Sequence, residues 1–153
     1  MAGDGAAKPG HIVISKTSAQ TVSVTALQND AELLFSVGTS ERWAFDMHLR
    51  TIQPSNDGGL IIGWTLPANA AIVMWGEQTG VSGDLVPHYA TTTGAASAFT
   101  RAGLTGNTNY HVYGTIISSG TSGTAQFMWS EGATANVTGV IVSSGAWLMA
   151  HKV

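Results

Sequence analysis

The chain has 153 residues, which is enough for one domain with a substantial buried core. Apolar residues make up 44% of it, which argues against intrinsic disorder, and only 10% are charged, well under the roughly 25% of an ordinary soluble domain. The net charge is −3 and the basic residues are scattered, so nucleic acid is not expected as a partner. The absence of cysteine excludes disulfides, thiolate metal sites and a cysteine nucleophile.

The first ten residues are small, rich in glycine and alanine, and end at Pro9-Gly10. This composition predicts a flexible N-terminal arm, with residues 11–153 forming a single domain. The arm lacks the basic and apolar regions of a signal peptide, so we expect synthesis in the cytoplasm. The uncharged stretch 59–76 has polar residues and a proline at its centre, where a membrane helix needs apolar ones. We interpret it as strand, turn and strand, and expect no membrane partner.

Alternation of apolar and polar residues predicts β-strands along most of the chain, and no 3.6-residue pattern lasts long enough for a helix. About eight to ten short strands at this spacing predict an all-β sandwich or barrel. In the loop-rich section 79–108 the pattern does not decide between loop and short strand at 84–93 and 97–104. The clearer strands are expected within 11–15, 20–27, 31–38, 41–52, 60–66, 71–78, 109–118, 123–131 and 135–153. The last pattern runs to the final residue, which predicts a C-terminus held inside a sheet.

The strand predicted at 41–52 has one apolar and one polar face, because its side chains alternate. The apolar face carries Trp43, Phe45, Met47 and Leu49. The polar face includes Asp46, His48 and Arg50. These three residues are either a ligand or proton-transfer site, or a solvated or intersubunit ladder, and we favour the ladder.

The residue types that usually act in catalysis or metal binding do not occur at the spacings typical of such sites. The histidines are spread over the chain, no pair of carboxylates has a spacing that commits it to acid–base catalysis, and no nucleophile or phosphate-loop motif occurs. His11 and His151 lie near opposite ends and would meet only across paired terminal strands. The sequence therefore predicts no enzyme activity, no metal site and no cofactor. The histidines are His11, His48, His88, His111 and His151.

Aromatic residues fall mostly in the predicted strands, where core packing is the default interpretation and a carbohydrate-binding platform the alternative. Tyr89, Tyr110 and Tyr113 are the better candidates for exposure. The residues thus predict a non-enzymatic domain that presents surfaces to copies of itself. The candidates for the core or for a subunit interface are Trp43, Tyr113, Phe127, Trp129 and Trp147.

Two long stretches resemble structural proteins of tailed-bacteriophage virions. The first, "KTSAQTVSVTALQNDAELLFSVGTSERWAFDMHLRT", has their Lys-Thr start, an "LQND" element and a W-x-F strand. The second, "NTNYHVYGTIISSGTSGTAQFMWSEGATANVTGVIVSSGAWLMAHKV", resembles their ending, with an aromatic strand, a Gly/Thr turn and a small-residue turn before the last strand. The resemblance covers residues 16–153. It implies a jelly-roll (TNF-like) antiparallel β-sandwich, commonly trimeric, of the head-decoration, head-fibre or tail-fibre type.

Among these types, a domain with only a short arm suits a decoration (cementing) protein. We expect a homotrimer that binds the outer face of the head, with the major capsid protein as partner, and that stabilises the shell. The arm would contact the capsid and become ordered on binding. The expected arm residues are Ala2, Gly3, Asp4, Gly5, Ala6, Ala7, Lys8, Pro9 and Gly10.

The main alternative is a tail-associated fibre or receptor-binding protein. It would place the region of Tyr89 or the loop 54–59 against a glycan on the host surface. A β-sandwich glycan hydrolase is disfavoured because no carboxylate pair stands out. A cellular cytokine-like trimer is disfavoured because no secretion signal is visible.

Overall fold

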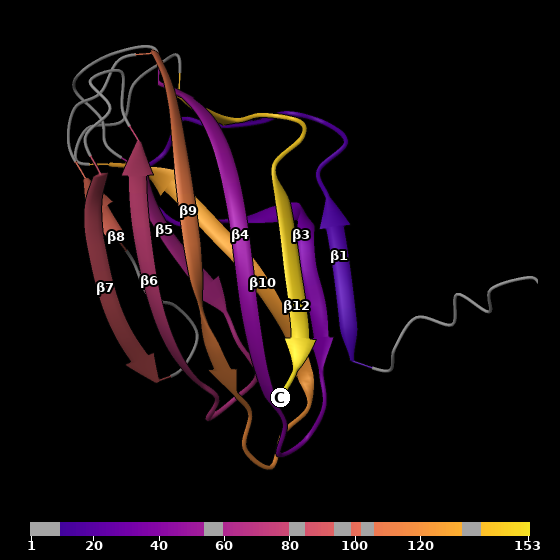
Figure 1. Cartoon of the computed structure of the whole chain (residues 1–153). Helices are drawn as coiled ribbons and strands as arrows, with labels where there is room; N and C mark the ends of the chain where they lie inside the picture. Colours follow the sequence, from indigo (N-terminus) through magenta and orange to yellow (C-terminus); the bar gives the residue numbers. More distant parts are fainter. Residues whose placement is uncertain (1–9, 54–59, 80–84, 94–98, 102–105, 133–138) are drawn as a thin grey trace, which may run out of the picture.

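The computed structural model describes residues 10–53, 60–79, 85–93, 99–101, 106–132 and 139–153. These residues form two antiparallel sheets packed face to face (Figure 1). Within them, no helix has the length and apolar character needed to span a membrane. The described strands are β1 (His11–Ser15), β2 (Gln20–Val22), β3 (Gln28–Val37), β4 (Arg42–Gln53), β5 (Leu60–Thr65), β6 (Ala71–Thr79), β7 (Leu85–Thr93), β8 (Phe99–Arg101), β9 (Gly106–Ile117), β10 (Gly123–Glu131), β11 (Val140–Val142) and β12 (Trp147–Lys152).

The order of the strands is that of a jelly roll. The large sheet runs β1-β12-β4-β9-β6-β7, and the small sheet runs β3-β10-β5-β8. The short β2 and β11 and the β6–β7 hairpin can be set aside and the eight remaining strands renumbered from 1 to 8 in chain order. Their order is then 1-8-3-6 in the large sheet and 2-7-4-5 in the small sheet. This arrangement is the double Greek key of jelly-roll domains. The predicted all-β, jelly-roll-like sandwich is therefore confirmed.

The β6–β7 hairpin is an addition to this plan. It comes between β5 and β8 of the small sheet, yet β6 pairs with β9 and so extends the large sheet (Figure 1). The large sheet thereby gains a wide outer face that the small sheet does not cover. Its strands β12, β4, β9 and β6 lie side by side and build the candidate site described below.

The C-terminal strand lies inside the large sheet, as its alternation predicts. β12 pairs with β1 on one side and with β4 on the other. The backbone N–H of Lys152 donates to the Gly10 carbonyl at 2.6 Å, and that of Val153 donates to the Arg42 carbonyl at 2.9 Å. His11 and His151 meet across β1 and β12, with ring centroids 6.4 Å apart.

The core between the sheets is centred on aromatic rings. Trp64 of β5 is fully buried, and its ring centroid lies 5.0 Å from that of Phe45 and 5.9 Å from that of Phe127. Phe35 completes the cluster, 5.3 Å from Trp43 and 6.4 Å from Trp64. Edge-on and tilted rings at these distances add favourable contacts to the burial of apolar area.

A single glycine allows β4, β9 and β6 to lie close together. Gly114 of β9 lies opposite Phe45 of β4, and the Phe45 ring occupies the space above it. A Cβ at this position would overlap the carbonyl oxygen of Val73 and would lie 2.8 Å from the Cα of Met74. The strand therefore requires glycine here, because a neighbouring backbone approaches too closely for any side chain.

Residues of the Lys-Thr and "LQND" elements connect the end of β1 to the start of β3. Lys16 and Asp30 are 3% and 0% exposed, and Lys16 Nζ lies 2.9 Å from Asp30 Oδ2. The same carboxylate accepts hydrogen bonds from the backbone N–H groups of Glu32 and Leu33 and from the Trp129 indole, at 2.9, 3.1 and 3.3 Å. The buried charges are thus paired and fully hydrogen-bonded, as burial requires.

Two carboxylates at the surface hold neighbouring loops. Glu32 accepts hydrogen bonds from the backbone and hydroxyl groups of Thr17 and Ser18, and these bonds lower the pKa of Glu32 to about 2. Glu41 accepts a hydrogen bond from Lys152 Nζ at 2.7 Å, one from the Trp43 indole and one from a backbone N–H. These bonds, that of Lys152 foremost, lower the pKa of Glu41 to about 2.

Candidate binding face

The outer face of the large sheet carries aromatic and imidazole rings where a solvated sheet would carry small polar residues. Strand alternation puts them there: Met47 and Leu49 of β4 point into the core, so Asp46 and His48 point outward. The same parity applies to β12, β9 and β6. We call these six residues the aromatic–histidine face: Asp46 and His48 of β4, Trp75 of β6, His111 and Tyr113 of β9, and Trp147 of β12.

The register of the sheet arranges these side chains in two rows. In one row, Trp147 lies opposite His48, which lies opposite His111. Their rings form a continuous stack, with centroids 4.5 Å apart for Trp147 and His48 and 4.3 Å apart for His48 and His111. Directly opposed residues on one face of a sheet are close enough for such contacts.

In the second row, Tyr113 lies opposite Asp46 on one side and opposite Trp75 on the other. The rings of Trp75 and Tyr113 stack at 6.0 Å with an interplanar angle of 19°. Trp75 is 39% exposed, a large fraction for this residue. The two rows touch where His111 packs against Tyr113, with centroids 5.0 Å apart.

A carboxylate and two imidazoles converge within this face. His111 Nε2 lies 3.1 Å from Asp46 Oδ2, and His48 Nε2 lies 3.5 Å from Asp46 Oδ1. The side chains of Asp46, His48 and His111 are 36%, 48% and 33% exposed. Oδ1 of Asp46 is nevertheless shielded from solvent and has no hydrogen bond. One oxygen of this carboxylate is therefore underused in the resting arrangement.

The environment of His48 favours its neutral form. Burial against the stacked rings lowers the pKa of this imidazole below its ordinary value of 6.5, and the nearby His111 ring lowers it further. The carboxylate of Asp46 acts in the opposite direction but does not compensate. A neutral imidazole keeps a nitrogen lone pair that can accept a hydrogen bond or bind a metal.

The structure divides the five predicted core-or-interface aromatics into two groups. Trp43, Phe127 and Trp129 are buried in the core. Tyr113 and Trp147 lie on the outer face, partly exposed. Whether these two take part in a subunit interface stays a prediction.

Other predicted residues have different outcomes. The expectation that Tyr110 is exposed is wrong: it is 7% exposed. The reason is strand parity, because Tyr110 and Tyr113 are three residues apart on β9 and so point to opposite faces. Arg50 lies one row beyond His48, opposite Asn109, and is not part of the converging cluster.

Several predicted sites lie outside the described residues. These are residues 2–9 of the arm and the loop 54–59, whereas Gly10 is described and anchors to β12 through its carbonyl. Tyr89 belongs to β7, of which only the backbone is described. Their roles in capsid or receptor contact stay predictions.

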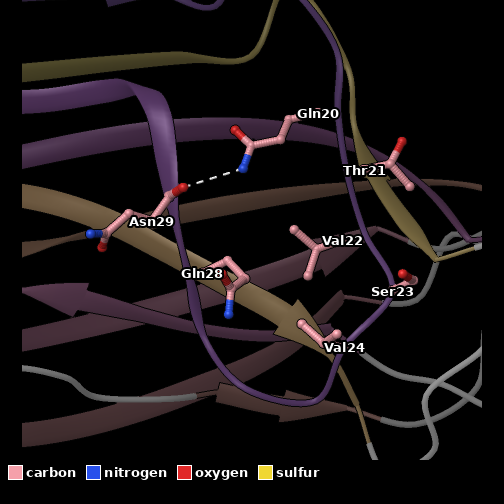
Figure 2. A pocket seen from close by; sticks show the side chains of 7 residues that line it. All are labelled: Gln20, Thr21, Val22, Ser23, Val24, Gln28 and Asn29. Carbon is pink, nitrogen blue, oxygen red and sulfur yellow. Dashed lines mark hydrogen bonds between the residues drawn. The ribbon is translucent and has the colours of Figure 1, made fainter.

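A hollow beside β2 and the start of β3 is a second, weaker candidate (Figure 2). Its volume is about 330 Å³, and its lining has amides, hydroxyls and two valines but no ring and no titratable group. The Gln20 amide already donates to the Asn29 carbonyl at 3.2 Å and accepts from the Ala31 N–H at 3.1 Å. Polar groups of this hollow are therefore already engaged in hydrogen bonds within the fold. The lining residues are Gln20, Thr21, Val22, Ser23, Val24, Gln28 and Asn29.

Comparisons with known proteins add little to this picture. No protein-family model matches the sequence, and no curated protein does. A mutant VP2 protein of infectious bursal disease virus, in derived T=1 particles, aligns at 8% identity over 95% of this chain with a TM-score of 0.26. A structure of the Gx strain of the same virus aligns at 11% identity over 93% with a TM-score of 0.22. The chain spans 40% of the length of each, and likenesses this slight carry no argument about function.

Proposed function

We propose that this chain is a virion structural protein: a decoration (cementing) protein of a tailed-bacteriophage head that binds the outer shell as a homotrimer and stabilises it. The observation that carries the proposal is the partly exposed aromatic–histidine face on one sheet of a jelly roll. Jelly rolls also serve in lectins and cupins, so the strand order alone leaves the function open. The resemblance of residues 16–153 to phage structural proteins supports a structural role in a virion over these other functions.

The occupant that best fits the aromatic–histidine face is another copy of the chain. Trp75 and Val13 are 39% and 63% exposed on this side of the sheet, and burying such apolar area contributes about 25 cal/mol per Å². The face also carries the carboxylate of Asp46 and two imidazoles, so identical copies offer each other both partners of a polar contact. Three copies around a common axis would cover rings that are partly exposed to solvent in a single chain.

The arm is the proposed contact to the major capsid protein. The hydrogen bond from the Lys152 N–H to the Gly10 carbonyl fixes its root at the β1–β12 edge of the large sheet. From there, residues 2–9 would reach the shell and become ordered on binding. Three arms on one trimer would bind with an avidity that one arm lacks. The proposal includes no enzymatic step, cofactor, nucleic acid or membrane.

The proposal is tested by co-sedimentation with heads of the source phage that lack this chain. The full-length chain is expected to sediment with the heads, at a stoichiometry in multiples of three, and to raise their resistance to heat. A variant without residues 2–10 is expected to keep its β-sheet circular dichroism but no longer to sediment with the heads. Failure of the full-length chain to bind any head preparation would contradict the decoration proposal.

A receptor-binding role on the tail is the second candidate, and one observation favours it. The stacked and exposed Trp75–Tyr113 pair is the kind of flat aromatic surface on which sugar rings pack. Glycan-array binding by the wild-type chain that is lost in Trp75→Ser, together with no binding to heads, would favour this role over decoration.

A further inference from the structure

We propose that Asp46, His48 and His111 form a binding site for a divalent transition-metal ion, with Zn²⁺ as the expected occupant. The three potential ligand atoms all lie within 4.8 Å of one another. Two imidazoles and one carboxylate are a ligand set that Zn²⁺ takes in proteins, with further positions left for water or another ligand. The proposal goes beyond the virion role. The three residues also belong to the face proposed to meet another copy, but one chain supplies all three ligands, so the site does not require that copy.

Each imidazole nitrogen approaches a different oxygen of the carboxylate. His111 Nε2 lies 3.1 Å from Asp46 Oδ2, a hydrogen-bond distance, and His48 Nε2 lies 3.5 Å from Asp46 Oδ1. Zn–N and Zn–O bonds of roughly 2.0–2.2 Å in a tetrahedron place neighbouring ligand atoms about 3.4 Å apart. Because the two imidazoles stack on one another, the half-exposed His48 ring must turn before both nitrogens can face one ion.

The shielded oxygen of Asp46 is a second observation that favours a cation. Oδ1 is closed off from water and has no hydrogen bond beyond the 3.5 Å contact with His48 Nε2, although a carboxylate oxygen seeks two or more partners. A bound metal ion would satisfy it. Glu77 lies directly opposite His111 on β6 and adds a negative charge to the same row of the sheet.

The pairing of the strands fixes the backbone positions of the three ligands before any ion binds. Asp46 and His48 are two residues apart on β4, and His111 faces His48 from β9 within a register of twelve consecutive residue pairs. Trp147 stacks on the far side of the His48 ring. Sites whose ligands stand on a regular sheet bind with less loss of conformational freedom than sites on loops.

The experiment is titration of the metal-free, full-length chain with ZnCl₂ at pH 7.5 by isothermal calorimetry. Wild type is expected to bind one Zn²⁺ per chain. Three variants remove a ligand and keep the shape of the side chain: Asp46→Asn, His48→Phe and His111→Phe. Each is expected to lower the affinity at least ~10-fold. The phenylalanines preserve the ring stack, so that a lost nitrogen and a lost packing contact are told apart.

The matched control is the double variant His11→Phe/His151→Phe. This histidine pair also stacks across two strands of the large sheet, but within the described residues it belongs to no cluster of metal-ligand type. It is expected to bind Zn²⁺ like wild type. Histidine ¹⁵N shifts, recorded with and without Zn²⁺, are expected to change at His48 and His111 alone. Absence of saturable binding in wild type, or loss of binding only in the control, would overturn the proposal.

Discussion

Lys16 Nζ and Asp30 Oδ2 lie 2.9 Å apart in the interior, with the two residues 3% and 0% exposed. The pair joins the segment after β1 to the third residue of β3, and the Trp129 indole contributes a further bond from β10 of the small sheet. Such a pair adds little stability over an apolar replacement, but breaking it leaves a buried charge. Its better-attested use is to fix one arrangement of the chain among competing ones.

Replacing Lys16 alone is therefore expected to be costly. Lys16→Met should lower the free energy of unfolding by about 3–5 kcal/mol, because the carboxylate of Asp30 stays buried without its cation. Urea unfolding followed by tryptophan fluorescence measures this. The matched control is Lys152→Met, which breaks the half-exposed pair with Glu41 and should cost far less, because exposed ion pairs are screened by solvent. Equal losses in the two variants would contradict the assignment of a structural role to the buried pair.

Acid stability depends on the two surface carboxylates whose pKa values are lowered to about 2, Glu32 and Glu41. A folded-state pKa below the ordinary value of 4.5 gives stability that is present above pH 4.5 and is lost as the pH falls towards 2. Glu32→Gln and Glu41→Gln should each flatten the dependence of the urea midpoint on pH within that window. A midpoint that falls as steeply between pH 4.5 and pH 2 in the variants as in wild type would rule this out.

Gly114→Ala is expected to destabilise the chain by at least ~1–3 kcal/mol, the usual cost of forcing atoms into a packed site. The added methyl group meets the backbone of Val73 and Met74, neither of which can move without breaking the pairing of β6 with β9. Gly120→Ala is the control, because no atom lies within 4 Å of a Cβ built there. Thermal unfolding of both variants checks this, and similar melting temperatures would contradict the close approach.

Removing rings from the aromatic–histidine face should change assembly more than folding. Light scattering after size exclusion is expected to give wild type three times the chain mass of 15.8 kDa. The double variant Trp147→Ser/Tyr113→Ser should shift towards the monomer and keep a cooperative unfolding transition. Val24→Ser removes an apolar group that is 43% exposed but does not belong to this face, and it should stay trimeric. A trimer that survives the double variant would place the interface elsewhere.

Local pattern predicted the strands well, because alternation is a property of neighbouring residues. β4 has the predicted apolar face, with Met47 and Leu49 buried. Boundaries were less accurate: the pattern at 20–27 continues to Val24 and beyond, yet β2 ends at Val22. The reason is that β2 pairs with β11, which is only three residues long, so alternation continues past the end of the pairing.

The converging cluster could not be predicted, because it depends on register. The alternation groups Asp46 and His48 on one strand face, but nothing in the local pattern places His111, on a distant strand, opposite His48. The buried Lys16 was missed for the same reason, since its partner lies on a different strand. In both places chain topology, not local preference, creates the polar contact.

The proposed decoration role places the chain on the outside of a phage head. Immunogold labelling of intact virions of the source phage, with antibody raised against this chain, tests this position. Gold distributed over the surface of the head is expected. Gold confined to the tail, or virions without any label, would contradict it.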